Sequence, residues 1–280
     1  MRFGLKTAPQ HTAWADVLSV WQAADGLEFF ESGWTFDHFY PIFSDSTGPC
    51  LEGWVTTTAL AQATRRLRVG VLVTGMPYRH PAVLANMAAT LDIVSHGRLE
   101  LGVGAGWNEE EAGAYGLDLH ETLRDRFDAF EGCEALIGLL RDETTTLAGR
   151  FVQLTDARCE PKPLQRPHPP ICIGGTGEQR TLRSAARYAQ HWNYPGGDVA
   201  TFRHKRDVLH QHCADLGRDP AEIVVSTHLR LPAADDVGPL VAQAEEFADA
   251  GLQLGIVSLP PPHTPTVLEP VVSALEHLRT

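Results

Sequence analysis

The sequence has little positive charge and no long hydrophobic run. It contains 23 Lys and Arg residues against 35 Asp and Glu residues, which gives a formal net charge of -12 at pH 7. Nucleic-acid binding depends on clustered basic side chains that neutralise phosphates, so this charge balance argues against a nucleic-acid partner. Apolar residues never extend over the roughly 18 consecutive positions that a membrane helix requires. The sequence therefore predicts neither a nucleic acid nor a membrane as a partner.

Cysteine is also sparse. The five cysteines are scattered, and none forms a C-x-x-C pair. The chain has no H-E-x-x-H motif, and His210 and His212 stand two positions apart, on different faces of a predicted helix. A disulfide framework and a metal site are therefore not expected. The chain begins with a strand-like run instead of the apolar stretch of a signal peptide, so we expect a protein of the reducing cytoplasm.

The chain does contain a regular alternation of short apolar runs and longer amphipathic segments. Its 280 residues are 43% hydrophobic and 21% charged, a composition typical of a globular protein. The strand-like runs are residues 2–5, 33–36, 67–73, 99–103, 170–173, 191–194, 223–226 and 254–258. The helical patterns are residues 14–24, 53–63, 81–94, 122–140, 177–189, 199–216, 238–250 and 264–278. Strict alternation of this kind implies a parallel sheet, and the number of units predicts a closed (β/α)8 TIM barrel over an open doubly wound sheet.

One segment, at about residues 143–169, is too long for an ordinary loop. Its Ala-Gly pair between TTTL and RFVQL predicts a β-hairpin, and a proline-rich tract then leads to the next strand. The chain contains no Gly/Ser linker and no low-complexity tract. We therefore expect a single domain, residues 1–280, with a hairpin insertion after the fourth helix.

The strand ends carry the candidate functional residues, because chemistry in a TIM barrel lies at the carboxyl ends of the strands. After the fifth strand, Gly174, Gly175, Thr176 and Gly177 precede a helix, so backbone N–H groups can surround an anion there. Arg180 follows in the first turn and can add positive charge. This pattern predicts a phosphate site; the alternative is a plain glycine turn.

Two other strand ends are informative. His38 follows the second strand, where it can donate or accept a proton near neutral pH; the alternative is a structural histidine beneath a loop. The stretch LELGVGAGWNEEE at 99–111 has the spacing G-x-G-x-G, which lacks the third glycine of the dinucleotide motif. Small residues at 104–106 let a flat group approach the backbone. The three acids at 109–111 predict a solvated first turn of a helix, and a glycosidase carboxylate pair is the less favoured alternative.

Taken together, these segments resemble a known family. The matching stretches are FDHF, LVTGMPYRHPAVLANMAATLDIVSHGRLELGVGAGWNEEE, AYG, CEPKPLQRPHPPICIGGTGEQRTLRSAARYAQHWN and VSLPPP. In order and spacing they resemble the luciferase-like monooxygenase superfamily, and more closely its branch of oxidoreductases that depend on the deazaflavin coenzyme F420. The resemblance implies a TIM barrel with an insertion after the fourth helix, a flavin or deazaflavin at the mouth of the barrel, and a homodimer.

The resemblance also implies roles for individual residues. His38 would be the proton donor or acceptor, and Asp37 would contact the cofactor. Thr74 and Gly75 correspond to a bulge with a non-proline cis peptide behind the central ring. The remaining residues implied to lie against the cofactor are Ala105, Gly106, Asn108, Gly174, Gly175, Thr176 and Gly177.

The chain departs from the sugar-phosphate dehydrogenases of this superfamily at two positions. They carry Glu where this chain has Trp107, and Trp where it has Ile42. We therefore expect an uncharged or hydrophobic substrate. Phe39, Tyr40, Ile42 and Trp107 would line its pocket if the loops fold over the ring; the alternative is that they form core beneath a loop.

The predicted function is hydride transfer between F420 and such a small-molecule substrate. The first alternative is an FMN-dependent monooxygenase that uses O2 and needs a flavin reductase as a partner. The second is a barrel that binds a cofactor without turnover.

Overall fold

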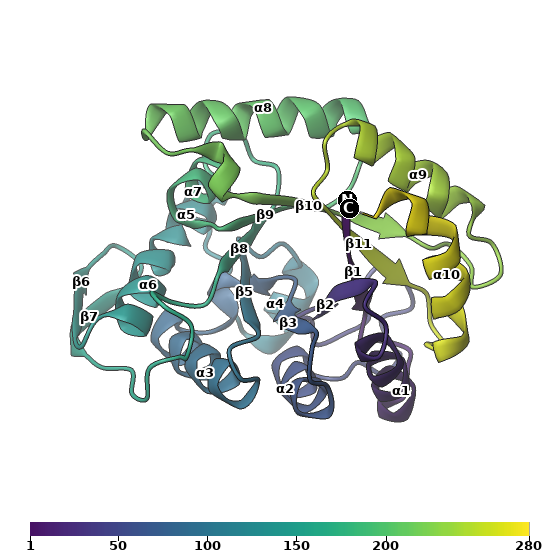
Figure 1. Cartoon of the computed structure of the whole chain (residues 1–280). Helices are drawn as coiled ribbons and strands as arrows, with labels where there is room; N and C mark the ends of the chain where they lie inside the picture. The colour runs from purple at the N-terminus through teal and green to yellow at the C-terminus, as the bar shows by residue number, and fades with distance from the viewer. Residues whose placement is uncertain (280) are drawn as a thin grey trace.

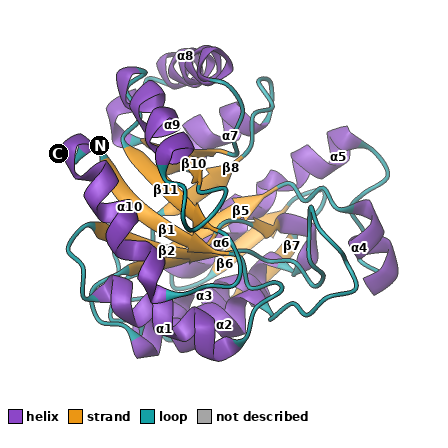
Figure 2. Cartoon of the chain, turned by 90° about the vertical axis from the view of Figure 1, so that its right-hand side faces the viewer, coloured by secondary structure: helices purple, strands orange, loops and turns teal. Residues whose placement is uncertain are grey.

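The computed structural model describes residues 1–279 and contains a closed barrel of parallel strands surrounded by helices (Figures 1 and 2). The barrel strands are β1 (Arg2–Thr7), β2 (Phe30–Thr35), β3 (Arg68–Val71), β4 (Thr74–Gly75), β5 (Leu99–Gly104), β8 (Ile171–Gly174), β9 (His191–Tyr194), β10 (Val224–Arg230) and β11 (Leu254–Leu259). Pairing of β3 with β5, in addition to the order β3-β2-β1-β11-β10-β9-β8-β5-β4, closes the sheet on itself. The predicted (β/α)8 barrel is confirmed.

The third strand position differs from its prediction in one respect. A continuous strand was expected at residues 67–73, but the structure has two short strands, β3 and β4, which both pair with β5. A non-proline cis peptide joins Leu72 to Val73 between them. The resemblance implied such a bond at Thr74 and Gly75, so the irregularity was expected correctly but lies two residues earlier.

Helices cover the outside of the barrel, as Figure 2 shows with helices in purple around the orange strands. They are α1 (Trp14–Asp25), α2 (Gly53–Ala63), α3 (Pro81–Val94), α4 (Glu109–Tyr115), α5 (Leu123–Asp128), α6 (Gly132–Arg141), α7 (Thr181–Tyr188), α8 (Val199–Asp215), α9 (Gly238–Asp249) and α10 (Leu268–Leu275). The single helix expected at 122–140 is divided into α5 and α6 by a 3-10 turn, Ala129–Glu131, in which Phe130 is buried. No helix within residues 1–279 is long and apolar enough to cross a membrane.

The predicted hairpin insertion is present as β6 (Thr145–Ala148) and β7 (Gln153–Ala157), which pair antiparallel. The tract that follows is fixed to the barrel wall by Asp92, a fully buried residue at the end of α3. The backbone N–H groups of Leu164 and Gln165 donate to its carboxylate at 2.7 and 2.9 Å. Buried hydrogen bonds to a carboxylate hold a segment firmly, so the insertion packs against the barrel as part of the same body.

The core has two parts. The larger part lies between the strands and the helices, and a smaller cluster inside the barrel contains Trp34, Leu72, Cys172, Leu254 and Ile256. Gly70 on β3 leaves room for the buried Trp34 ring, because a Cβ at that position would lie 2.5 Å from the indole. Side chains of this cluster therefore fill the lower barrel, and a cavity opens above them, at the carboxyl ends of the strands.

The amino-terminal end of the barrel interior contains a buried ion pair. Nδ1 of His191 on β9 lies 2.9 Å from Oε2 of Glu100 on β5, and Nε of Arg68 donates to the other carboxylate oxygen at 2.7 Å. The second ring nitrogen of His191 lies 2.6 Å from Oγ of Ser226. This network ties together β3, β5, β9 and β10 at the end of the barrel that is opposite the predicted site.

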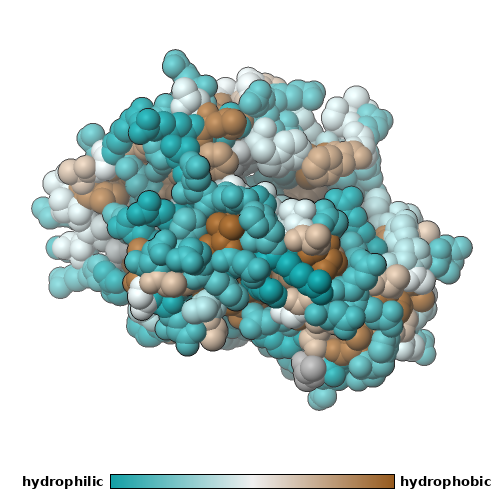
Figure 3. Space-filling view, turned by 90° about the horizontal axis from the view of Figure 1, so that it is seen from above, coloured by the Kyte–Doolittle hydropathy of each residue, from teal (hydrophilic) through white to brown (hydrophobic). Residues whose placement is uncertain are grey.

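Most of the surface seen in Figure 3 is hydrophilic. On the face seen in Figure 3, hydrophobic side chains occur as separate patches among hydrophilic ones.

Candidate active site

A cavity of about 1040 Å³ lies at the carboxyl ends of the barrel strands. Its size is that of a pocket for a cofactor with a small substrate. Eleven of the residues predicted from the sequence line it: Asp37, His38, Ile42, Gly75, Ala105, Gly106, Trp107, Gly174, Gly175, Thr176 and Gly177. Residues far apart in the sequence thus come together at the end of the barrel where chemistry was expected.

Two predicted cofactor residues, Thr74 and Asn108, are not among the lining residues of this cavity. Thr74 is fully buried, and its hydroxyl accepts a hydrogen bond from the indole N–H of Trp54 at 2.8 Å. The side chain of Asn108 accepts from the backbone N–H of Glu111 at 3.2 Å and caps the start of α4. Both side chains have structural partners in the protein.

Phe39 and Tyr40 also lie outside the lining. The ring of Phe39 stacks on Tyr115 with centroids 4.5 Å apart and on Tyr78 at 5.5 Å, and Tyr40 lies against Tyr115 at 5.6 Å. The alternative interpretation, packing beneath a loop, describes these two residues, whereas Ile42 and Trp107 do line the cavity.

The main polar feature of the cavity wall is a hydrogen-bond network around His38. Nδ1 of His38 lies 2.8 Å from Oε2 of Glu111, and the hydroxyl of Tyr78 donates to the same oxygen at 2.7 Å. The backbone N–H groups of Phe39 and Tyr40 donate to the other carboxylate oxygen. Glu111 is fully buried, so the protein satisfies its carboxylate from four directions.

These hydrogen bonds determine the protonation of the network. Burial alone would raise the pKa of Glu111, but hydrogen bonds from His38, Tyr78 and the Phe39 N–H outweigh it and hold the pKa below its ordinary value. Burial and the adjacent Glu111 raise the pKa of Tyr78, which therefore stays a hydrogen-bond donor. An ionised Glu111 accepts from Nδ1–H of His38, which leaves Nε2 as the nitrogen that can exchange a proton.

Glu111 corrects a prediction made from the sequence. Glu109, Glu110 and Glu111 were expected to form a solvated helix turn, and only the first two are exposed. Glu111 occupies the third helical position after the cap Asn108, where its backbone N–H is held by the cap and its side chain turns toward the loop after β2. The available signal was the cap spacing, with Glu111 three positions after Asn108 and directly before the apolar Ala112.

Asp37 is adjacent to His38 in the chain but interacts with a different residue. Its carboxylate forms an ion pair with Arg79, whose guanidinium also donates to Glu52 at 2.7 Å. The Asp37 side chain is fully buried. The predicted contact of Asp37 with a cofactor stays a prediction; in this conformation the carboxylate holds Arg79 next to the loop that carries His38.

The predicted phosphate loop follows β8 directly. Gly175 has φ of +132°, a conformation that L side chains rarely adopt, and an added Cβ would lie 3.0 Å from Thr181. Trp192 fixes the loop by donating from its indole N–H to the Gly175 carbonyl at 2.8 Å. Within residues 1–279, the backbone N–H groups of Thr176 and Gly177 have no partner in the protein, and α7 starts four residues further on. The loop therefore presents free donors and a helix amino terminus to the cavity.

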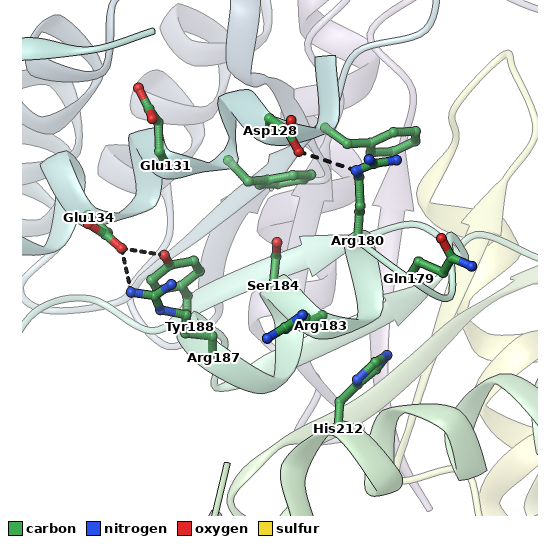
Figure 4. A pocket seen from close by; sticks show the side chains of 12 residues that line it. Asp128, Glu131, Glu134, Gln179, Arg180, Arg183, Ser184, Arg187, Tyr188 and His212 are labelled. Carbon is green, nitrogen blue, oxygen red and sulfur yellow. Dashed lines mark hydrogen bonds and ion pairs between the residues drawn. The ribbon is translucent and has the colours of Figure 1, made fainter. Parts of the chain in front are cut away.

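Arg180 is directed away from this loop. It lines a second pocket of about 620 Å³ beside α7, where its Nε donates to Asp128 at 3.2 Å (Figure 4). At the other end of that pocket, Arg187 pairs with Glu134 at 2.6 Å. The predicted contribution of Arg180 to phosphate binding is thus not supported by its position, because its charge is compensated in the neighbouring pocket.

The chain is similar to known proteins over most of its length. Residues 1–268 match the luciferase-like monooxygenase family. A Mycobacterium tuberculosis protein named only as uncharacterized is 31% identical over 211 residues, which cover 75% of this chain and 70% of that one. The 4-hydroxyprotoasukamycin monooxygenase of Streptomyces nodosus subsp. asukaensis is 28% identical over 254 residues, covering 84% and 67%.

A solved structure, that of an F420-dependent secondary alcohol dehydrogenase with an F420-acetone adduct, superposes with a TM-score of 0.85 at 18% identity and covers 98% of each chain. At this identity the likeness shows the fold alone. The match over residues 1–268 identifies the family: the chain belongs to the luciferase-like monooxygenases, whose members are oxidoreductases and monooxygenases.

Proposed function

We propose that this protein is an F420-dependent oxidoreductase that transfers a hydride between the deazaflavin and an organic substrate in the cavity at the barrel mouth. The observation that carries the proposal is His38, a cavity-lining histidine whose Nδ1 is fixed by the buried Glu111. Hydride transfer to or from a carbonyl carbon requires a proton to move at the oxygen. A positioned imidazole is suited to that task.

The cavity fits a deazaflavin with respect to size and wall chemistry. Gly104, Ala105 and Gly106 form a wall without large side chains, against which a flat ring can lie. The N–H groups of Thr176 and Gly177 would hold the phosphate. When bound, F420 supplies the hydride chemistry; a deazaflavin lacks the ring nitrogen with which reduced flavins activate oxygen, so the reaction would be a dehydrogenase or reductase step.

The protein residues would manage the proton and exclude water. His38 would donate or accept a proton through Nε2, while Glu111 holds Nδ1 and stabilises the charged ring. The ring of Trp107 lies 5.5 Å from that of His38 and stacks on the exposed Phe43 at 5.3 Å, and His38 itself is buried, so the half-exposed Trp107 shields one side of the imidazole. This cover strengthens the electrostatic interactions within the site.

A second candidate function is an FMN-dependent monooxygenase with a separate flavin reductase. The observation that favours it is the similarity to 4-hydroxyprotoasukamycin monooxygenase over 84% of this chain. The same small-residue wall and phosphate loop could accept FMN, so the two functions differ first in the cofactor.

A fluorescence titration of the purified protein with F420 and, separately, with FMN tests the proposal. Binding of F420 at least about tenfold tighter than that of FMN is the expected result. The reverse preference would move the protein to the monooxygenase class, and failure of both to bind would favour a barrel with no role in this chemistry. A variant with Gly175→Asp serves as the negative control for binding at the loop.

A further inference from the structure

The side of the cavity formed by β1, β10 and β11 carries three basic side chains that the sequence patterns did not single out. Lys6, His228 and Arg230 all line the cavity. Lys6 pairs in register with Ser258, and Ser258 pairs with Arg230. In a parallel sheet, residues in register point to the same face, and strands lie about 4.8 Å apart, so Lys6 and Arg230 stand on one level two strands apart. His228 precedes Arg230 by two residues and points to the same face one level deeper.

These basic groups have no negative partner in the protein. Within residues 1–279, Asp37 is the only acid among the residues that line the cavity, and its carboxylate is held by Arg79. Nζ of Lys6 has one hydrogen bond, to the Leu72 carbonyl at 3.5 Å. The Arg230 guanidinium makes no hydrogen bond or ion pair with any described residue. Lys6 is partly buried and Arg230 is exposed at the mouth of the cavity, so two cations face the cavity without an anionic partner in a chain of net charge -12.

His228 provides an independent observation. Its Nδ1 is buried and has no hydrogen-bond partner among the described residues, whereas buried ring nitrogens are normally satisfied. Burial lowers the pKa of Lys6 to about 8, with Arg230 adding to the effect, and burial together with both cations lowers the pKa of His228 well below its ordinary value. Each of these groups would be stabilised by an anion placed between Lys6 and Arg230.

We propose that Lys6, Arg230 and His228 bind a carboxylate group of the substrate. This inference rests on the proposed function, because it assigns the substrate class of the same cavity. A carboxylate matches the fork of an arginine and accepts from an ammonium at the same time. Ile42 and Trp107 line the cavity on the His38 side and provide apolar surface for the rest of the molecule. The sequence predicted an uncharged or hydrophobic substrate. The substrate proposed here has a hydrophobic body, as predicted, and in addition a carboxylate at one end.

Matched pairs of probes test the proposal by calorimetry. We would titrate hexanoate, 4-phenylbutanoate and 2-oxohexanoate, each with its neutral amide, into the protein with and without bound F420. At least one carboxylate is expected to bind about tenfold or more tightly than its amide. Inorganic phosphate is a further probe. If no carboxylate exceeds its amide, or if phosphate binds while the carboxylates do not, the proposal is wrong.

Three variants test whether the carboxylate binds at Lys6 and Arg230. Lys6→Met and Arg230→Leu are each expected to abolish the preference for the carboxylate, while Arg183→Met, which removes an exposed arginine beside α7, should leave it unchanged. Because the Lys6 ammonium is partly buried without an anionic partner, Lys6→Met should melt at the same temperature as the wild type or higher, which separates loss of binding from misfolding.

The F420 titration keeps the two proposals distinct. Failure of F420 to bind would overturn the proposed function, whereas the carboxylate preference is measured on the cofactor-free protein as well. If Lys6→Met and Arg230→Leu weaken F420 binding about tenfold and the wild type shows no carboxylate preference, the basic side chains belong to the cofactor site and the substrate proposal is wrong.

Discussion

Nδ1 of His38 lies 2.8 Å from Oε2 of Glu111, although the two residues are separated by 73 positions in the chain. One residue comes from the loop after β2, and the other comes from α4 after β5. The carboxylate is fully buried and ionised, so it orients the imidazole and can balance its positive charge when the ring is protonated.

His38→Ala is expected to leave F420 affinity within about threefold of the wild type and to lower turnover of a proton-coupled substrate by about 10²- to 10⁴-fold. The reason is that His38 would exchange the proton and would not carry the cofactor. Steady-state kinetics together with the fluorescence titration measure both quantities. His204→Ala removes an exposed histidine of α8 and is the control. Unchanged turnover in His38→Ala would remove His38 from the mechanism.

Glu111→Gln is expected to change the tautomer of His38 and to lower turnover less than His38→Ala does. An amide can donate to Nδ1, so the preference for the proton on that nitrogen is lost. Nitrogen-15 NMR of labelled histidine reports the tautomer directly. The loss of a charged acceptor with four donors should also reduce the free energy of unfolding by about 1 to 3 kcal/mol.

Glu110→Gln is the matched control, because Glu110 is the exposed neighbour on the same helix turn. Its effect on the free energy of unfolding should stay within about 0.5 kcal/mol. If the two variants behave alike in NMR and in kinetics, the buried carboxylate has no positioning role.

The sequence allowed the barrel and the glycine-rich walls of the site to be predicted, because both depend on local patterns. Apolar runs mark the strands, and the glycines between Gly174 and Gly177 favour a turn through their own backbone freedom. Glu111 was missed since its burial depends on Tyr78 and His38, which approach it from other elements. Lys6 and Arg230 were missed for a similar reason: only the register of β1, β11 and β10 brings them to one level.

Gly175→Asp is expected to weaken cofactor binding more than Gly175→Ala does, by a further factor of about ten or more. Both variants carry the same strain at φ of +132° and the same contact of the Cβ with Thr181, and only Asp adds a negative charge where a phosphate would lie. The dissociation constants for F420 of the two variants give the comparison. Equal weakening would show that the loop tolerates an anion and that the phosphate lies elsewhere.

Glu100→Gln is expected to destabilise the barrel by about 3 to 5 kcal/mol near pH 5.5, because it leaves His191 and Arg68 without their buried carboxylate. Burial would raise the pKa of Glu100, but His191 and Arg68 outweigh it and lower the pKa to about 2. Burial would lower the pKa of His191, yet its contacts with Cys172 and Glu100 raise it to about 10.

The directions of the Glu100 and His191 pKa shifts define the pH range in which their ion pair stabilises the barrel. The contribution of Glu100 is present above its ordinary pKa of 4.5 and is lost as the pH falls toward 2. The contribution of His191 is complete below its ordinary pKa of 6.5 and is lost as the pH rises toward 10. Urea unfolding of wild type and variant should therefore show a larger difference in unfolding free energy at pH 5.5 than at pH 8.5. Glu276→Gln, at an exposed ion pair with Arg279, should cost less than about 1 kcal/mol at both values. A difference for Glu100→Gln that stays constant or grows toward pH 8.5 would mean that His191 is neutral in the native barrel.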